Sequence, residues 1–188
     1  MLNKHLARIP VFAYGSNICS SRMQCRVRSA QFLGIASAAN WKVVFNKRGA
    51  DGSGKANLVK AADHQTWGAL WAIPAPELSS LDVFEPDYEH IEIEVKLRQE
   101  TMSALAYTAC SDALTDVPAF KWYVSLVTRG LSALGAPESY IVGLAGTKAQ
   151  TDSDESRRSN AAEQQCQGAE DILQIQQHAF QPPAVDTE

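Results

Sequence analysis

Residues 90–98, HIEIEVKLR, alternate between polar and apolar side chains at every position. A period of two places all the apolar side chains on one face of an extended strand and all the charged side chains on the other. The chain is therefore expected to contain a sheet with one buried face and one solvated face. The segment ALAYTA, residues 104–109, follows after a turn and is expected to pair with this strand.

Other segments predict a mixture of strands and helices. Because proline suits the first turn of a helix, a short helix is expected over 76–84 with Pro76 in that turn, and another is expected to open at Pro137. A longer helix is expected to have Asp116 as its N-cap and to end at Gly135. Further short strands are expected at Ile9–Tyr14, Trp41–Asn46, Asn57–Ala61 and Thr66–Ile73.

The charge and polarity of the chain change near residue 148. Residues 1–147 carry 14 basic and 13 acidic side chains, whereas residues 148–188 carry 3 basic and 8 acidic ones. The second segment is too polar to pack a core of its own. We therefore expect one domain over 1–147 and a polar acidic tail over 148–188, with a short amphipathic helix at 162–180.

Composition also narrows the class of protein. The near-neutral balance of residues 1–147 lacks the basic excess that binds nucleic acid. The N-terminal residues carry charges where a signal peptide needs an apolar stretch, and no apolar run is long enough to span a membrane. The four cysteines lack C-x-x-C spacing, which favours reduced thiols. We expect a cytoplasmic protein without nucleic-acid or membrane partners, and its oligomeric state stays open.

The first expected strand runs directly into a turn, in the sequence VFAYGSN over Val11–Asn17. An ordinary turn explains the glycine by its backbone freedom and the asparagine by its side-chain bond to the chain. A turn that leaves a strand can also aim several backbone N–H groups at one point, which suits a carboxylate or an oxyanion. The residues alone leave both interpretations open.

Several motifs, taken in order, resemble the gamma-glutamylcyclotransferase family. FAYGSN matches the first motif of that family, and LDVFE, residues 81–85, matches its Leu-Asp-x-x-Glu. DGSGKANLV, residues 51–59, is similar to a run found in bacterial members. Together with residues at family-like spacing between Tyr107 and Tyr140, the resemblance covers about residues 9–146. The chain departs from the family just after Glu85, and whether Tyr88 or His90 takes the usual post-glutamate position stays open.

The resemblance implies a fold, a reaction and a set of site residues. The implied fold is α+β, a small mixed barrel-like sheet with flanking helices, followed here by the polar tail. The implied reaction releases 5-oxoproline from a small-molecule gamma-glutamyl substrate, through attack of the substrate's own alpha-amine on its gamma-carbonyl, with Glu85 as the general base. It needs no cofactor, no metal and no enzyme nucleophile. The implied substrate contacts are Phe12, Ala13, Tyr14, Gly15, Ser16, Asn17, Tyr107 and Tyr123.

Alternative interpretations remain for several of these residues. GADGSGKA, Gly49–Ala56, fits the phosphate-binding pattern G-x-x-x-x-G-K, but Ala56 replaces the magnesium ligand and a strand is expected to follow. A hairpin loop whose Lys55 reaches an acidic substrate is the favoured interpretation. Cys19 and Cys25 lack the spacing of a thiol hydrolase. Tyr107 and Tyr123 could be ordinary core tyrosines.

Two functions stay open at this point. One is a cyclotransferase, whose leaving amine could be a free amino acid, a polyamine, glutathione or a biosynthetic intermediate. The other is a binding or regulatory protein of the same fold that holds a small carboxylate without turnover. A poised carboxylate at Glu85 beside the YGSN turn favours the first function, because a pure binder has no need of one.

Overall fold

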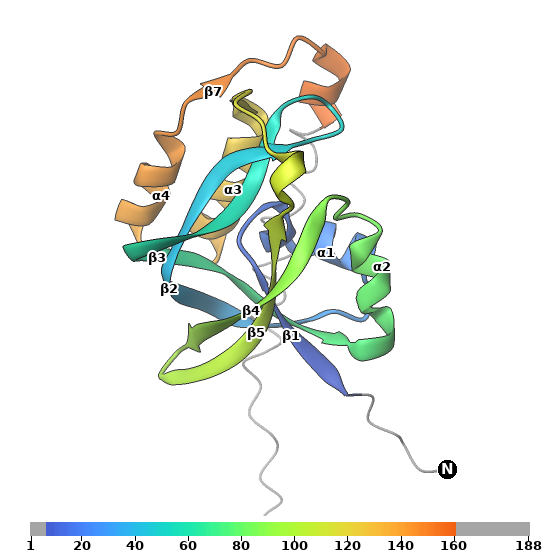
Figure 1. Ribbon diagram of the computed structural model, residues 1–188, viewed down its shortest axis with the longest axis vertical. Helices are drawn as coiled ribbons and strands as arrows, with labels where there is room; N and C mark the ends of the chain where they lie inside the picture. Colours follow the sequence, from blue (N-terminus) through green and yellow to red (C-terminus); the bar gives the residue numbers. More distant parts are fainter. Residues whose placement is uncertain (1–6, 161–188) are drawn as a thin grey trace, which may run out of the picture.

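Two long antiparallel strands, β2 (Gln31–Arg48) and β3 (Gly54–Pro74), form the frame of the molecule. The computed structural model describes residues 7–160. Figure 1 shows the two strands as a twisted ribbon, with their connecting hairpin near its upper end. This hairpin carries the glycine-rich sequence that resembles a phosphate-binding loop, but β3 follows it, so a strand stands where such a loop needs a helix.

The sheet closes into a barrel with the strand order β1-β3-β2-β4-β5. β1 (Arg8–Ala13) pairs antiparallel with β3, and β4 (Tyr88–Leu97) pairs antiparallel with both β2 and β5 (Glu100–Ala109). One parallel pair, Val11 with Leu105, joins β5 to β1 and completes the barrel. The expected α+β class and the barrel-like sheet with flanking helices are confirmed.

The two strands expected at Asn57–Ala61 and Thr66–Ile73 are parts of the single strand β3. Asn40 and Asp63 have left-handed backbones, with φ of 62° and 63°, and the register of β2 and β3 shifts at this point. Asparagine and aspartate tolerate this conformation better than other residues do. The polar residues therefore bend the ribbon where the sequence alone predicts that the strand ends.

The helices flank the barrel, and the longest begins later than expected. Ala119–Phe120 form the short strand β6, which pairs in parallel with β7 (Ala149–Gln150), so α3 (Lys121–Ala133) begins after Asp116 and Pro118. α3 ends just before Gly135, whose φ of 77° suits a helix end. The other labelled helices are α1 (Ser20–Arg26), α2 (Leu78–Asp82) and α4 (Glu138–Ala145), with 3-10 turns η1 (Ser16–Ile18), η2 (Ala75–Glu77) and η3 (Ser111–Ala113). Residues 155–160 are also helical.

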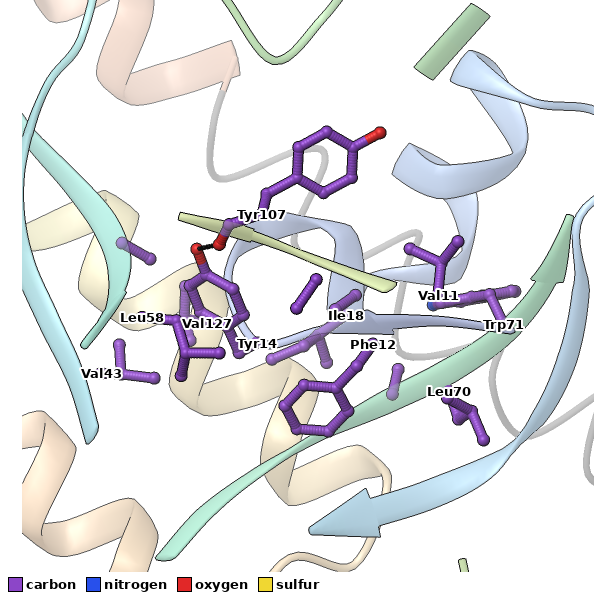
Figure 2. Packing of buried hydrophobic residues seen from close by; sticks show 14 of the residues in the cluster. Val11, Phe12, Tyr14, Ile18, Val43, Leu58, Leu70, Trp71, Tyr107 and Val127 are labelled. Atoms are coloured by element: carbon purple, nitrogen blue, oxygen red, sulfur yellow. Dashed lines mark hydrogen bonds between the residues drawn. The ribbon is translucent and has the colours of Figure 1, made fainter. Parts of the chain in front are cut away.

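The core lies between the inner face of the barrel and α3, and it holds the turn after β1 in place. Figure 2 shows apolar side chains from β1, β3 and α3 converging around Tyr14, including Leu58 and Val127, which are both fully buried. A Cβ atom at Gly130 would lie 2.8 Å from Ile18 Cγ2. Glycine at this position therefore lets α3 pack directly on η1.

Some residues beyond 148 pack against the domain. Asp152 is buried, and it accepts hydrogen bonds from Trp122 Nε1–H at 2.9 Å and from Arg157 Nη2–H at 2.7 Å. The domain boundary near 148 stays a prediction, and the helix expected at 162–180 lies outside the described residues. Within residues 7–160, no helix is both long enough and apolar enough to cross a bilayer.

The buried Asp152 generates a stability prediction. Hydrogen bonds from Arg157 lower the pKa of Asp152 below its ordinary value, although burial acts in the opposite direction. A group with a lowered pKa stabilises the fold above its unfolded-state value of about 3.9, and this contribution is lost as the pH falls below it. We expect Asp152→Asn to lower the melting temperature by several degrees at pH 7 and the deficit to shrink in acid. Asp154→Asn is the control, because its half-exposed carboxylate contacts the same arginine, and an equal loss in both variants would contradict this role for Asp152.

Candidate active site

A partly open cavity lies where β1 ends, and its empty space together with adjoining open solvent is about 380 Å³. Every residue that the sequence predicts as a site residue lines it, although they come from segments far apart in the chain. Within residues 7–160, the lining contains one carboxylate and no basic side chain. The lining residues are Val11, Phe12, Ala13, Tyr14, Gly15, Ser16, Asn17, Ala56, Glu85, Tyr88, Tyr107 and Tyr123.

The turn after β1 is packed tightly against its neighbours. A Cβ atom at Gly15 would lie 3.0 Å from Ala56 Cβ and 3.4 Å from the Tyr123 hydroxyl. The indole N–H of Trp71 donates to the carbonyl of Asn17 at 3.1 Å. The turn runs directly into η1, and the first N–H groups of a helical turn have no partner within it. The backbone here is thus held in one position beside the cavity.

Glu85 follows α2 and meets two side chains from the opposite wall. Asn17 Nδ2–H donates to Glu85 Oε1 at 2.8 Å, and Arg26 Nη1–H donates to the same oxygen. Arg26 Nη1–H also donates to Asn17 Oδ1 at 2.8 Å, which closes a ring of three residues. The side chains of Arg26 and Glu85 are only 11% and 15% exposed, so the ion pair is shielded from water.

Both of these bonds end on Oε1 of Glu85. Oε2 accepts no hydrogen bond from the part of the chain that the structure describes. Two donors fixed on one carboxylate oxygen set the direction of the group and leave the other oxygen to accept a hydrogen bond. Glu85 is therefore an oriented carboxylate with one acceptor oxygen left for a ligand.

Four tyrosines line the cavity, and the hydroxyls of Tyr14, Tyr88 and Tyr123 form hydrogen bonds with the backbone. The Tyr14 hydroxyl donates to the carbonyl of Tyr107, as the dashed line in Figure 2 shows. The Tyr88 hydroxyl donates to the Ala56 carbonyl at 2.6 Å, while the Ala56 N–H donates to the Tyr123 hydroxyl at 3.3 Å. Burial raises the pKa of each of these four phenols. They remain neutral near pH 7 and serve as walls and hydrogen-bonding groups, not as bases.

The structure separates Tyr88 from His90. Tyr88 lines the cavity, whereas His90 Nε2 lies 2.8 Å from Asp82 Oδ1 on the outer side of the Tyr107 ring. The Tyr107 hydroxyl donates to the same oxygen of Asp82 at 2.6 Å. The aspartate of the LDVFE motif therefore fixes the direction of the Tyr107 hydroxyl.

Sequence reasoning missed the basic residues of this region. Arg22 and Arg26 lie on α1, a helix that the sequence analysis does not predict. Their spacing of four residues, which puts two side chains on one helix face, was the available signal. None of the three described cysteines lines the cavity, and no group of three or more His, Cys, Asp or Glu side chains within residues 7–160 could hold a metal ion.

Comparisons with known proteins show what this chain is similar to. Residues 65–144 match the AIG2-like family. The chain is 28% identical over 137 residues to the gamma-glutamylcyclotransferase of Bos taurus, which covers 69% of this chain and 73% of that protein. The Homo sapiens protein of the same name is 26% identical over the same coverage. A solved structure titled gamma-glutamyl cyclotransferase superposes with a TM-score of 0.73 at 22% identity, covering 83% of this chain and 99% of the other.

The shielded ion pair generates a double-mutant prediction. Removing one partner leaves the other charge poorly solvated, so Arg26→Met should lower the free energy of unfolding by about 3 kcal/mol. In the Arg26→Met background, adding Glu85→Gln should cost less than about 1 kcal/mol, because no paired carboxylate remains to be lost. Urea unfolding of the wild type, both single variants and the double variant measures the coupling. Additive losses would show that the two side chains do not depend on each other.

Proposed function

The chain carries an AIG2-like family domain on the gamma-glutamylcyclotransferase fold, and from that premise we propose that it is a cyclotransferase. Its substrate is a gamma-glutamyl amide, and its products are 5-oxoproline and a free amine. The proposal takes the reaction from the family and assigns its steps to residues of this cavity.

One observation carries the proposal. Glu85 is the only carboxylic acid among the described lining residues, and burial raises the pKa values of the tyrosines beside it. Because the nucleophile belongs to the substrate, the protein has to supply a base and a cavity that holds the substrate in a folded shape. A cavity with one oriented carboxylate and no basic side chain, set against a turn of backbone amides, has the parts that this reaction requires.

The chemistry begins at the alpha-ammonium of the glutamyl group. Glu85 accepts a proton from it, and the resulting amine attacks the gamma-carbonyl carbon to form the lactam C–N bond. The tetrahedral intermediate then collapses, and the bond from the carbon to the leaving nitrogen breaks. The attacking nitrogen loses two protons in becoming the lactam N–H, and the leaving nitrogen takes up two to depart as ammonium. Glu85 can relay these protons with no net uptake from solvent.

The rest of the cavity holds the substrate in its reactive shape. Backbone amides at Gly15 and Ser16 suit the negative charge that develops on the carbonyl oxygen. Tyr107 and Tyr123 serve as walls against which the glutamyl chain folds. Holding an internal nucleophile near its target gives effective molarities of about 10⁵ to 10⁸ M. Most of the rate enhancement would therefore come from orientation.

The substitution Glu85→Gln tests the assignment of the base. Glutamine keeps the shape of the side chain and can still accept a hydrogen bond from Asn17, but it cannot take up the ammonium proton. We expect 5-oxoproline formation to fall by about 10²-fold to 10⁴-fold. Binding of 5-oxoproline, measured by calorimetry, should stay within about tenfold of the wild type, because the turn and the tyrosines are unchanged.

Glu89→Gln is the matched control, since Glu89 is an exposed glutamate on β4 outside the cavity. Its turnover should equal that of the wild type. Undiminished turnover in Glu85→Gln would show that another group is the base. If the wild type binds 5-oxoproline but forms it from no gamma-glutamyl compound, the protein is a carboxylate-binding protein of the same fold.

A further inference from the structure

A second and larger chamber adjoins the cavity at Glu85. It has an empty volume of about 780 Å³. Ser16, Glu85, Tyr88 and Tyr123 line both spaces. If the glutamyl chain of a gamma-glutamyl amide fills the first cavity with its gamma-carbonyl beside Glu85, its leaving group extends away from that cavity. The second chamber lies where that leaving group would extend.

The chamber differs from the first cavity in its charge. Its lining contains four basic side chains and two acidic ones, whereas the first cavity has a single carboxylate. Arg22 and Arg26 come from α1, Lys47 comes from β2, and Lys55 comes from the start of β3. Of the two acids, Glu85 already pairs with Arg26. Lys47 pairs with Asp87, which lies outside the lining, at 3.3 Å. The basic residues of the chamber therefore come from one helix and two strands.

Lys55 is held with a hydrogen-bond donor to spare. Its ammonium donates to Asp51 Oδ2 at 2.6 Å and to Ser53 Oγ at 2.9 Å. An ammonium has three donors, so one stays available within the described surroundings. The same group lies 4.9 Å from the Trp122 ring centre and 4.7 Å from that of Tyr123, and the lysine side chain is only 17% exposed. Lys55 is thus fixed beside a wall that the two spaces share.

Asp51 forms an ion pair with Lys55 and fixes its position, and the third ammonium donor is what Lys55 offers to a ligand. Its carboxylate accepts from Lys55, from the Ser53 N–H at 3.0 Å and from the Ser53 hydroxyl at 2.9 Å. Burial acts to raise the pKa of Asp51, but these hydrogen bonds outweigh it and lower the pKa. The carboxylate is therefore occupied in holding the hairpin loop and its lysine.

The basic side chains of the chamber also repel one another, which favours the binding of an anion there. Burial lowers the pKa of Arg22, and the nearby Arg26 lowers it further. Burial also lowers the pKa of Lys55; Asp51 opposes this shift, whereas Arg22 and Arg157 add to it. An anion in the chamber would offset the cost of holding these cations together.

We propose that the second chamber is a leaving-group subsite for an amine that bears two carboxylates, such as an acidic amino acid. This proposal rests on the cyclotransferase function proposed above. The alpha-carboxylate of a leaving amino acid is two bonds from the scissile nitrogen, which places it near the arginines of α1 beside Glu85. A side-chain carboxylate extends further, toward Lys55. A cationic polyamine would meet repulsion at both positions.

The test compares two dipeptides that differ by one charge. Gamma-glutamyl-glutamate and gamma-glutamyl-glutamine have nearly the same shape, but only the first has a side-chain carboxylate. We expect the wild type to prefer the first by about 10-fold to 100-fold in kcat/KM, the range of a charge-assisted hydrogen bond. The preference should fall as ionic strength rises. In Lys55→Met it should drop to near unity.

Lys60→Met is the matched control, because Lys60 is an exposed lysine on the same strand. It should keep the wild-type preference. Lys55→Gln, which can still hydrogen-bond Asp51, serves as a second variant in case Lys55→Met does not fold. Equal kcat/KM for the two dipeptides in the wild type would overturn the subsite and leave the cyclotransferase function standing. So would a preference that persists in both Lys55 variants.

The experiment also distinguishes failure of the proposed cyclotransferase function from failure of the proposed subsite. If neither dipeptide yields 5-oxoproline, calorimetry with the same two dipeptides still tests the chamber. Tighter binding of gamma-glutamyl-glutamate by the wild type, lost in the Lys55 variants, would support an anion-selective subsite without turnover. Equal binding of the two dipeptides, or no binding of either, would overturn it.

Discussion

The arrangement of the site depends on the shielded ion pair between Arg26 and Glu85. This contact joins α1 to the end of α2, two helices that Figure 1 shows beside each other on one side of the barrel. Asn17 bridges the pair and ties it to the turn after β1. Two charges largely removed from water are tolerated only when each has its partner and its hydrogen bonds. The three residues therefore fix where the carboxylate stands relative to the turn.

Under the proposed function, the two spaces that meet at Glu85 divide the recognition of the substrate. The first cavity, with its turn amides, its phenols and a single carboxylate, suits a compact glutamyl group that must fold on itself. The basic chamber on the other side of Glu85 suits what the glutamyl group is joined to. Lys55 belongs to a hairpin whose sequence resembles a phosphate-binding loop, yet its partners are Asp51, Ser53 and the aromatic side chains of α3. The glycines there serve a tight hairpin between two long strands.

Much of the secondary structure can be predicted from the sequence, because the periodicity of apolar side chains is a local signal. Alternation over 90–98 predicts β4, and the apolar run ending in YGSN predicts β1 and its turn. Prediction from the sequence fails where the pairing of distant strands overrides the local preference of the residues. Polar residues at Asn40 and Asp63 resemble strand ends but bend a continuous ribbon, and Ala119–Phe120 leave the expected helix to pair with Ala149–Gln150. The site residues could be predicted because they belong to recognisable motifs, and the structure brings them together in one cavity. Arg22, Arg26 and the role of Asp82 became visible only when α1, α2 and β5 were placed in space.

The identity of the product tests the central claim most directly, since it separates an internal nucleophile from water. The wild type is incubated with gamma-glutamyl-glutamate in water enriched in heavy oxygen, and the products are analysed by mass spectrometry. Attack by the substrate's own amine yields one 5-oxoproline for each amine released, with no heavy oxygen in the ring carbonyl. Free glutamate that carries heavy oxygen would instead show hydrolysis, and would contradict a cavity that folds its substrate for cyclisation.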